Sequence, residues 1–477
     1  MNFEESHFIP LVNRQANLLD GRFCRCEKMP QSGSSRMYFR ILLDNSKTII
    51  GVYNDDIREN RAFFYFTRFF NKKQLNVPQL LAIDDSECYY LLSDLGDTTL
   101  YSWLQQEREN VLLGENVKKY YRKVIEQLPK WQLSAQQQMD FSVCYPRFAF
   151  DRQSIQWDLN YFKYYFLKLA AIPFDEQLLE NDFQVFTDWL LEADAHYFLC
   201  RDFQSRNIMI YQNDVYFIDY QGGRKGPLQY DIASLLYDAK AAITPLEREE
   251  LLQYYLAQFA QYQEIDREKF VYYFDGFVLV RILQALGTYG FRGYYEKKVH
   301  FLQSIPYAIE NISYLLQKGS LPVAIPYLCH VLQELTKSDF VHYYKEAPNK
   351  LTVTVTSFSY KKGIPTDFSP NGGGFVFDCR ALPNPGREAA TSAYTGKDVA
   401  VIDWIEQHPE FEEFKKHVWE LVSASVRNYA ARKFTQLMVN FGCTGGQHRS
   451  VYCAEQIADL LRLQFPDIVV MLHHINL

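Results

Sequence analysis

The sequence that decides the fold of this chain is the stretch LCRDFQSRNIMIYQNDVYFID, residues 199–219. In it Asp202 is followed five positions later by Asn207, and an apolar run then ends in a second acid, Asp219. Transfer of a phosphoryl group to a hydroxyl needs one carboxylate beside the acceptor oxygen, and an amide and a second carboxylate that hold Mg²⁺ against the nucleotide phosphates. The order and spacing of these three side chains favour this chemistry over a plain polar hairpin loop.

The composition of the chain limits the classes of protein to which it can belong. With 477 residues, 48% of them hydrophobic and 22% charged, it is long enough for more than one domain and can bury a sizeable core. Its net charge of −7 argues against binding of the whole protein to nucleic acid or anionic membranes. Nine cysteines at irregular spacing suit reduced thiols, and the sequence has no signal-peptide pattern and no run of about 18 apolar residues. We therefore expect a cytoplasmic protein with no membrane segment.

Changes in periodicity along the chain predict its domain organisation. Short alternating strands dominate up to about residue 95, and helical patterns dominate from 96 to about 335. The polar stretch 336–350 contains one proline and is predicted to be a linker. Strands and helices alternate after it, which predicts a smaller α/β domain at 351–477. The expected fold class is therefore α+β, with a bilobal first domain at 1–335.

Two stretches of the β-rich lobe are candidates for contact with a nucleotide. A turn of small residues precedes a predicted strand, and its backbone N–H groups would approach phosphate oxygens; the alternative is an ordinary hairpin. The stretch 89–100 is predicted to be a buried strand that breaks at Gly96 into a helix, which predicts a hinge whose backbone hydrogen-bonds adenine. The candidate cofactor-binding residues are Ser32, Gly33, Ser34, Ser35, Asp94 and Leu95.

Several motifs resemble the aminoglycoside phosphotransferase/choline kinase family, which shares the protein-kinase fold. They are GSSRMYFR, LLSDLGDTTL, FLCRDFQSRNIMI and FIDYQGGRKGPLQYDIASLL, and the resemblance covers about residues 5–330. It implies that Asp202 is the catalytic base, that Asn207 and Asp219 bind Mg²⁺, and that ATP or GTP is the phosphoryl donor. The resemblance is nearest to a bacterial branch that phosphorylates the anomeric hydroxyl of N-acetylmuramate and N-acetylglucosamine in cell-wall recycling.

The sequence departs from the family pattern at two positions. Cys200 stands where the catalytic loop usually has a bracing histidine, and the strand Ile49–Tyr53 has no lysine to clamp the nucleotide phosphates. Arg36, Arg40 or Lys47 could replace this lysine, and the sequence does not choose between them. A kinase lobe without catalytic activity therefore stays open as an alternative.

Three further features have both a functional and a structural interpretation. Trp157–Tyr165 mixes aromatic faces with polar groups, which suits a sugar ring but also an aromatic core helix. Asp231 resembles the aspartate with which the family braces the catalytic loop, and we expect it to be structural. Arg201 and Arg206 either neutralise phosphate charge or pair with neighbouring carboxylates.

A second candidate site is the sequence FGCTGGQHRSV, residues 441–451, between a predicted strand and a predicted helix. Two glycines permit close approach of the backbone, and a helix N-terminus and two cationic side chains add donors, so the loop suits a phosphate. The alternative is a plain helix entry with Ser450 as its N-cap. Five residues separate the cysteine from the arginine, which is also the spacing of cysteine-dependent phosphatases. The candidate phosphate-site residues are Cys443, Thr444, Gly445, Gly446, Gln447, His448, Arg449 and Ser450.

The motifs GCTGGQHRSV, SFSYKKGIP, VFDCRALPNP and TGKD resemble the C-terminal domain of the RNase adapter protein RapZ over residues 351–472. This resemblance implies that residues 443–450, joined by Arg380 and Asn384, bind an amino-sugar phosphate, and that a basic surface binds small RNAs. Residues 350–477, however, contain equal numbers of basic and acidic residues. We therefore do not expect RNA as a partner.

These features together predict an ATP- and Mg²⁺-dependent sugar kinase that acts on the anomeric hydroxyl of an amino sugar such as N-acetylmuramate or N-acetylglucosamine. The C-terminal domain is expected to bind a phosphosugar, to regulate the kinase and to offer a surface for oligomerisation. Two alternatives stay open. One is a non-catalytic metabolite sensor or RNA adapter of the RapZ type, and the other is a cysteine-dependent phosphatase in the C-terminal domain.

Overall fold

The computed structural model describes residues 3–30, 36–108, 112–136, 138–170, 172–296, 298–338, 350–365 and 373–477. Contacts within it divide the chain into two units, Met1–Thr288 with Tyr307–Thr336, and Tyr289–Pro306 with Lys337–Leu477. Most of the predicted linker, residues 339–349, lies outside the described residues.

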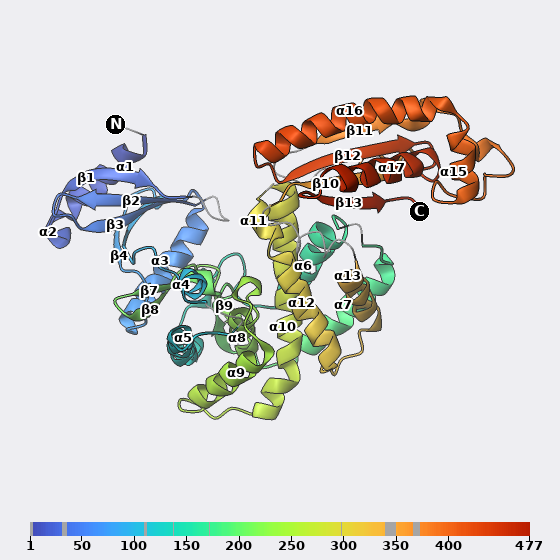
Figure 1. Cartoon of the computed structure of the whole chain (residues 1–477). Helices are drawn as coiled ribbons and strands as arrows, with labels where there is room; N and C mark the ends of the chain where they lie inside the picture. Colours follow the sequence, from blue (N-terminus) through green and yellow to red (C-terminus); the bar gives the residue numbers. More distant parts are fainter. Residues whose placement is uncertain are drawn as a thin grey trace. The chain divides into compact units, whose positions relative to one another are not determined.

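The first unit begins with a five-stranded antiparallel sheet in the order β1-β2-β3-β5-β4 (Figure 1). Because side chains alternate along a strand, Phe39 and Ile41 of β2 point to one face, where they pack in one cluster with Phe8 of the first helix. The opposite face carries Tyr38 and Ile50 and borders a cavity. The elements of this part are α1 (Phe3–Arg14), α2 (Ala16–Leu19), β1 (Phe23–Lys28), β2 (Met37–Leu43), β3 (Thr48–Tyr53), β4 (Leu80–Ile83) and β5 (Tyr89–Ser93).

Helix α3 (Ile57–Lys72) joins this sheet to the catalytic segment. The side chain of Asp56 caps its N-terminus by accepting two backbone N–H groups of the first turn. Phe63 of the helix stacks on Tyr220 with ring centroids 5.3 Å apart, and Phe70 meets the same ring edge-on at 5.5 Å. Since Tyr220 directly follows the second predicted metal ligand, α3 fixes the position of that ligand relative to the sheet.

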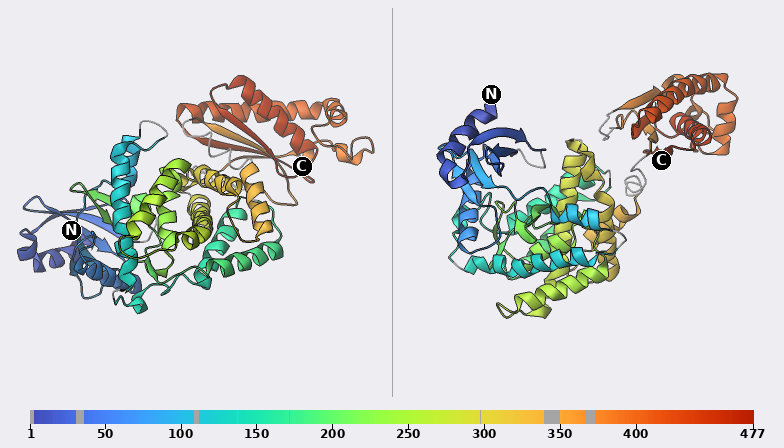
Figure 2. Two further views of the ribbon diagram at one scale, coloured as in Figure 1. Left: turned by 90° about the horizontal axis from the view of Figure 1, so that it is seen from below. Right: turned by 60° about the vertical axis from the view of Figure 1, so that its left-hand side comes forward.

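Helices make up most of the rest of the first unit, beside the small sheet that Figure 2 draws in blue. Two short antiparallel ladders carry the catalytic segment, and they pair β6 (Tyr197–Leu199) with β9 (Arg224–Gly226) and β7 (Ile208–Tyr211) with β8 (Asp214–Phe217). The helices are α4 (Leu100–Glu107), α5 (Glu115–Leu133), α6 (Arg152–Phe162), α7 (Glu176–Leu190), α8 (Leu228–Leu236), α9 (Pro245–Phe259), α10 (Arg267–Gly290), α12 (Ile305–Lys318) and α13 (Pro326–Lys337).

Among the described residues, one helical stretch, Arg267–Tyr295, is long and apolar enough to cross a membrane by its length and composition alone. In its most apolar window of 18 residues, 78% is buried inside the structure. Burial of this kind is what an apolar core helix of a globular protein has.

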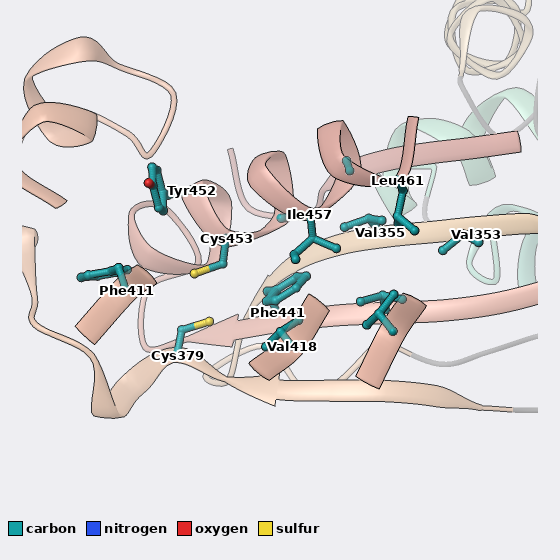
Figure 3. Close-up of a cluster of buried hydrophobic side chains, with 14 of the residues drawn as sticks. Val353, Val355, Cys379, Phe411, Val418, Phe441, Tyr452, Cys453, Ile457 and Leu461 are labelled. Atoms are coloured by element: carbon teal, nitrogen blue, oxygen red, sulfur yellow. The ribbon is translucent and has the colours of Figure 1, made fainter. Parts of the chain in front are cut away.

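The second unit contains a parallel four-stranded sheet in the order β11-β12-β10-β13. Val355 and Phe441, from the two central strands, point to the same face and pack against Val418 and Ile457 of two long helices (Figure 3). This arrangement of helices on a parallel sheet confirms the predicted α+β class with a smaller α/β part. The elements are α11 (Val299–Leu302), β10 (Thr352–Ser359), β11 (Gly374–Asp378), α15 (Val399–Glu406), α16 (Pro409–Ala431), β12 (Gln436–Cys443), α17 (Arg449–Gln464) and β13 (Val469–His474).

Several boundaries differ from those that the sequence indicates. Strands β1 and β13 were not expected, since Phe23–Lys28 mixes cysteines with charged residues and shows no apolar alternation. From the sequence alone we predict a helix over Tyr230–Lys240, whereas α8 runs from Leu228 to Leu236. Helix α17 begins at Arg449 with His448 at the N-cap position, so Ser450 lies inside its first turn and is not the N-cap.

Candidate functional site

The predicted catalytic loop follows β6, and Asp231 of α8 holds its backbone. The backbone N–H groups of Cys200 and Arg201 donate to the two carboxylate oxygens of Asp231 at 2.7 and 3.0 Å. Arg201 has a positive φ of 76°, a backbone conformation that residues other than glycine rarely adopt. Surrounding contacts must therefore hold the backbone in this conformation. Burial raises the pKa of Asp231 to about 7, and the two N–H groups oppose that rise. Asp231 thus braces the loop, as the resemblance implies, and Cys200 contributes its backbone rather than a side-chain brace.

The three side chains at the centre of the kinase prediction lie together. Asn207 ends a short turn, and its Nδ2 donates to Asp219 Oδ2 at 3.1 Å and to the backbone oxygen of Asp202 at 2.9 Å. Asp219 has a positive φ of 64°, and its Oδ1 accepts a hydrogen bond from Gln221 at 2.8 Å. Burial raises the pKa of Asp219, the neighbouring carboxylate of Asp202 raises it further, and Gln221 opposes both. A cation bound at Asp219 would offset this repulsion between like charges.

The donor atoms at this place fit a small hard cation. Asn207 Oδ1 and the carboxylate oxygens of Asp219 are oxygen ligands of the kind that Mg²⁺ prefers. Within the described ranges there is no cluster of three or more His, Cys, Asp and Glu side chains that could hold a metal ion by itself. Mg²⁺ is commonly held by one or two protein groups together with substrate phosphates and water, so the small number of protein ligands here suits a metal that arrives with a nucleotide.

The Asp202 carboxylate is open to an incoming substrate. Its side chain is 41% exposed, and the nearest cation to it in an ion pair is Arg281 of α10, with Nη2 3.7 Å from Oδ1. Arg281 itself is fixed, because its Nε donates to Ser234 Oγ at 2.9 Å. A carboxylate that is reachable from solvent and held near a fixed cation can accept a proton from a bound hydroxyl.

Arg201 of the catalytic loop is paired inside the protein. Its Nη2 donates to Asp158 Oδ1 of α6 at 2.7 Å, and the Asp158 side chain is almost completely buried. Arg201 therefore pairs with a neighbouring carboxylate, which is the second of the two interpretations given for it above. The same contact places α6 beside the catalytic loop. Trp157 on this helix is 47% exposed, whereas Phe162 is fully buried, so the helix has both an exposed aromatic side chain and a core face.

A cavity of about 290 Å³ lies against the inner face of the small sheet and reaches Asp219. The predicted hinge residues Asp94 and Leu95 line it, and Ser32–Ser35 lie outside the described residues. The Asp94 carboxylate accepts from Arg40 Nε at 2.7 Å and from the Gly96 N–H at 2.8 Å. Burial would raise the pKa of Asp94, but these hydrogen bonds lower it below its ordinary value. The carboxylate therefore holds the hinge in shape, and the hinge backbone remains the candidate contact for a base.

The structure separates the three candidates for the missing lysine. Lys47 is exposed and its Nζ lies 3.7 Å from Asp20. Arg40 forms ion pairs with Asp94 and Asp97 at 2.7 and 2.8 Å, at the hinge. Arg36 is 3% exposed, lines the cavity, and its Nη2 lies 2.9 Å from Glu59 Oε2.

Sequence reasoning missed Glu59 and Gln221. The sequence signal for Glu59 is its place in the first turn of the helix that follows β3, where a kinase carries the partner of its phosphate-clamping lysine. Gln221 follows Asp219 by two residues, and no pattern in the sequence distinguishes it from other polar loop residues.

In the second unit, residues 443–450 form one compact loop between β12 and α17. The Gly446 N–H donates to Cys443 Sγ at 3.2 Å, and the Ser450 hydroxyl lies 3.1 Å from the same sulfur. Burial would raise the pKa of the Cys443 thiol, but the Ser450 hydroxyl, the backbone N–H groups and the charge of Arg449 lower it below its ordinary value. The turn at 395–398 (TGKD) supports the loop, because the Gly396 N–H donates to the Gln447 backbone oxygen at 2.8 Å.

The cationic side chains around this loop are mostly engaged elsewhere. The Arg449 guanidinium donates to the backbone oxygens of Arg380 and Leu382 at 2.9 and 3.0 Å. The Arg380 guanidinium makes a two-pronged pair with Asp378, with Nε–Oδ1 and Nη2–Oδ2 distances of 2.9 and 2.6 Å. Among the described residues, backbone N–H groups, His448 Nε2 and Arg449 Nε, the last two buried without a hydrogen-bond partner, are thus the donors that the loop keeps for an anion.

Asn384 and His448 meet at one edge of the loop. Asn384 Oδ1 accepts from the Gly386 N–H at 3.2 Å, and a side chain at Gly386 would come within 3.2 Å of the His448 ring. His448 Nε2 is buried without a hydrogen-bond partner among the residues that the structure describes. Of the two residues expected to join the anion loop, Asn384 lies beside it, and Arg380 contributes a backbone oxygen to Arg449.

Comparison with known proteins assigns the first part of the chain. A family model described as the phosphotransferase enzyme family matches residues 27–267, just over half of the chain. The chain belongs to this family. A model of the RapZ C-terminal domain matches residues 351–477. The predicted combination of a kinase-like phosphotransferase domain with a RapZ-like C-terminal domain is therefore confirmed.

Curated relatives match only a part of the chain. A nucleotide-binding protein of Dichelobacter nodosus is 40% identical over 119 residues, which are 25% of this chain and 41% of that protein. A nucleotide-binding protein of Acidovorax ebreus is 38% identical over 135 residues, 27% of this chain and 45% of that protein. The chain thus spans less than half of the length of these relatives.

Solved structures with a similar fold include two small-molecule kinases. Gentamicin-bound APH(2")-IIa has a TM-score of 0.43 and 15% identity, covering 66% of this chain and 96% of that chain. Choline kinase from Cryptosporidium parvum has a TM-score of 0.43 and 14% identity, covering 65% of this chain and 93% of that chain.

Proposed function

We propose that the first unit transfers the γ-phosphoryl group of ATP or GTP to a hydroxyl of a sugar. The observation that carries this proposal is the contact of Asn207 with Asp219 and with the backbone oxygen of Asp202, beside a cavity of about 290 Å³ that Asp219 lines. A cavity of this size lies at the lower end of the range for small-molecule sites, and part of a nucleotide would extend beyond it.

The proposed chemistry assigns one task to each of these side chains. Asp202 accepts the proton of the acceptor hydroxyl, since its carboxylate is exposed and nothing else in the loop offers an open base. Asn207 and Asp219 hold Mg²⁺, which when bound with the nucleotide neutralises charge on the phosphates. An anomeric hydroxyl is more acidic than an ordinary alcohol, so a carboxylate of ordinary basicity suffices to receive its proton.

The proposed acceptor is an amino sugar, with N-acetylmuramate or N-acetylglucosamine and their anomeric hydroxyl as the specific candidates. Two features support this class. The motifs of the first unit resemble the kinase branch that uses these acceptors. Helix α6, which the Arg201–Asp158 pair places beside the catalytic loop, also carries the exposed aromatic side chain of Trp157, whose flat face suits a sugar ring.

The second unit, in this proposal, binds a phosphosugar at residues 443–450. Backbone N–H groups at the start of α17, together with His448 Nε2 and Arg449 Nε, are the donors available to the phosphate. Such a module would sense the product of the kinase or a related metabolite.

Nucleotide consumption in the presence of a panel of hexosamines tests the kinase proposal. Asp202→Asn should abolish turnover while Mg-ATP affinity and thermal stability stay as in the wild type, because the substitution removes the base and keeps the shape. Asp55→Asn, an exposed aspartate before α3, is the matched control and should keep full activity. Equal rates for the wild type and Asp202→Asn would remove the proposal.

Calorimetry distinguishes the kinase proposal from the alternative of a non-catalytic sensor or adapter. A protein of that kind would bind a hexosamine phosphate in the second unit and show no affinity for Mg-ATP. Measurable Mg-ATP binding, with turnover of a sugar, excludes it.

A cysteine-dependent phosphatase is a second candidate function, favoured by one observation. Cys443 Sγ lies within hydrogen-bond distance of Gly446 N and Ser450 Oγ, contacts that would stabilise a thiolate nucleophile. Against it, the Arg449 guanidinium donates to backbone oxygens, where a phosphatase would direct it to the phosphate. Release of inorganic phosphate from a hexosamine phosphate, lost in Cys443→Ser, would establish this activity.

A further inference from the structure

The position at which kinases carry their phosphate-clamping lysine is apolar in this chain. On β3, Ile50 lines the cavity, and Val52 is the next residue on the same face of the strand. Val52 lies between Tyr38 of β2 and Tyr90 of β5 in the sheet register, and both of these tyrosines line the cavity. Val52 is fully buried and has no charge, so β3 cannot supply the clamp.

The residue just before the neighbouring strand brings a cation to the same cavity. Arg36 directly precedes β2, two residues before Tyr38, and both side chains line the cavity. Only 3% of Arg36 is exposed, and its Nη2 lies 2.9 Å from Oε2 of Glu59 in the first turn of α3. This pair joins the segment that enters β2 to α3. The lysine–glutamate pair of a kinase makes a similar link, but there the cation lies on β3.

The guanidinium of Arg36 has donor capacity left for a ligand. Its Nε is buried without a hydrogen-bond partner within the part of the chain that the structure describes. A buried charged group whose N–H donor lacks a partner lowers the stability of the folded protein, unless a ligand accepts a hydrogen bond from that donor. Arg36 and Asp219, a proposed metal ligand, line the same cavity.

The other two basic candidates do not have this freedom. Arg40 is bound to two carboxylates at the hinge end of the same cavity, and Lys47 is exposed at the hairpin turn beside Asp20. A guanidinium presents several donors in one plane and matches phosphate oxygens two at a time, which a single ammonium cannot do.

We propose that Arg36, held by Glu59, binds the α- and β-phosphates of the donor nucleotide and so replaces the missing β3 lysine. The inference rests on the proposed kinase function, because it assigns the cavity to a nucleotide. It also gives Glu59 a positioning role, since Glu59 acts through Arg36 and does not touch the nucleotide.

Calorimetry on the full-length chain with Mg-ATP, Mg-ADP and adenosine tests the assignment. Arg36→Met keeps most of the side-chain volume and removes the charge, and we expect it to weaken Mg-ATP and Mg-ADP binding about 10- to 100-fold while adenosine binding stays within about twofold. Arg36→Lys should recover part of the loss, because an ammonium restores charge but not the paired donors. Arg61→Met, an exposed arginine of α3 that pairs with Glu87 outside the cavity, is the control for loss of charge and should bind all three ligands as the wild type does.

Each outcome separates this inference from the kinase proposal. If the wild type does not bind Mg-ATP, the kinase proposal fails and the inference fails with it. If the wild type binds Mg-ATP and Arg36→Met binds it equally well, or loses adenosine binding to the same extent, the inference alone is overturned. If Arg36→Met does not fold, Glu59→Gln is the deciding variant. An Mg-ATP affinity several-fold below that of the wild type, with unchanged adenosine affinity, supports the role of Arg36. An unchanged Mg-ATP affinity overturns that role.

Discussion

At the scale of single residues, Asp231 shows how a buried carboxylate determines the shape of a loop. Both of its oxygens accept backbone N–H groups, from Cys200 and Arg201, in a region closed to water. Asp231→Ala would leave two buried donors without a partner, and we expect it to lower the free energy of unfolding by about 2–5 kcal/mol, to be measured by urea denaturation.

The control for this prediction is Asp231→Asn, which keeps one carbonyl oxygen and should cost less than half as much. A fall of less than about 0.5 kcal/mol in Asp231→Ala, the level of an ordinary surface substitution, would show that the loop is held by other contacts.

A second prediction at this scale concerns the Cys443 thiol. Its pKa lies below that of an ordinary thiol because the hydrogen bonds from Ser450 and Gly446 outweigh the effect of burial. Ser450→Ala removes one of these donors, so the pKa of Cys443 should rise and thiolate should form only at higher pH. Alkylation of this residue, followed peptide by peptide by mass spectrometry over pH 6–10, should shift its midpoint upward in the variant. A shift to lower pH, or none, would contradict the role given to the hydroxyl.

The proximity of the three candidate residues could be predicted from the sequence because their relation is local. Asp202, Asn207 and Asp219 lie within one loop and one hairpin, and their spacing alone brings them together. The choice between Arg36 and Arg40 could not be made in this way. It depends on the register of β2 against β3 and on the place of α3, which no local pattern states.

At the scale of elements, two glycines near the start of α17 have different tasks. A Cβ on Gly396 would lie 2.3 Å from the backbone oxygen of His448 and 2.6 Å from the backbone N of Tyr452, whereas one on Gly445 would meet nothing within 4 Å. We expect Gly396→Ala to push the 395–398 turn away from the helix entry and to lower the thermal stability of the second unit. Gly445→Ala should leave stability unchanged and weaken binding of a hexosamine phosphate, because the methyl group stands where the phosphate would approach.

Differential scanning calorimetry and isothermal titration on the same two variants check both parts of this prediction. If Gly445→Ala binds the phosphosugar as the wild type does, the anion does not approach the loop at that glycine. If Gly396→Ala is as stable as the wild type, the turn does not support the helix entry.

Element by element, the sequence predicted the types of most segments and missed those without periodicity. The strands β3 and β10 alternate or are strongly apolar, and the helices α3 and α16 have a clear apolar face, so all four were expected. The edge strand β1 is held by backbone hydrogen bonds to β2. Such pairing does not require an alternating pattern of apolar side chains, so the sequence of β1 does not reveal it.

At the scale of the whole molecule, the two units should respond to different ligands. Each has a hydrophobic core of its own, so each can unfold as a separate transition. A ligand present at 100 times its dissociation constant stabilises the folded form that binds it by about 2.7 kcal/mol. We expect Mg-ATP to raise the midpoint of one calorimetric transition and a hexosamine phosphate to raise the midpoint of the other. A single transition that both ligands raise would show that the units unfold as one.

The α+β class and the presence of two parts could be predicted from the change in periodicity near residue 350. The grouping of Tyr289–Pro306 with the second unit could not, because it depends on contacts between segments far apart in the sequence and the local pattern there continues that of the preceding helix.

The ion pair between Arg201 and Asp158 has a consequence for how such an enzyme is controlled. In kinases that are activated by phosphorylation, the phosphate added to the activation loop pairs with arginines and orders that loop. Here the counter-ion for the loop arginine is an aspartate of α6, encoded in the chain and 2.7 Å away. In the proposed kinase the loop arginine therefore needs no added phosphate as its counter-ion, and we expect turnover to follow the supply of metabolites rather than an upstream covalent signal.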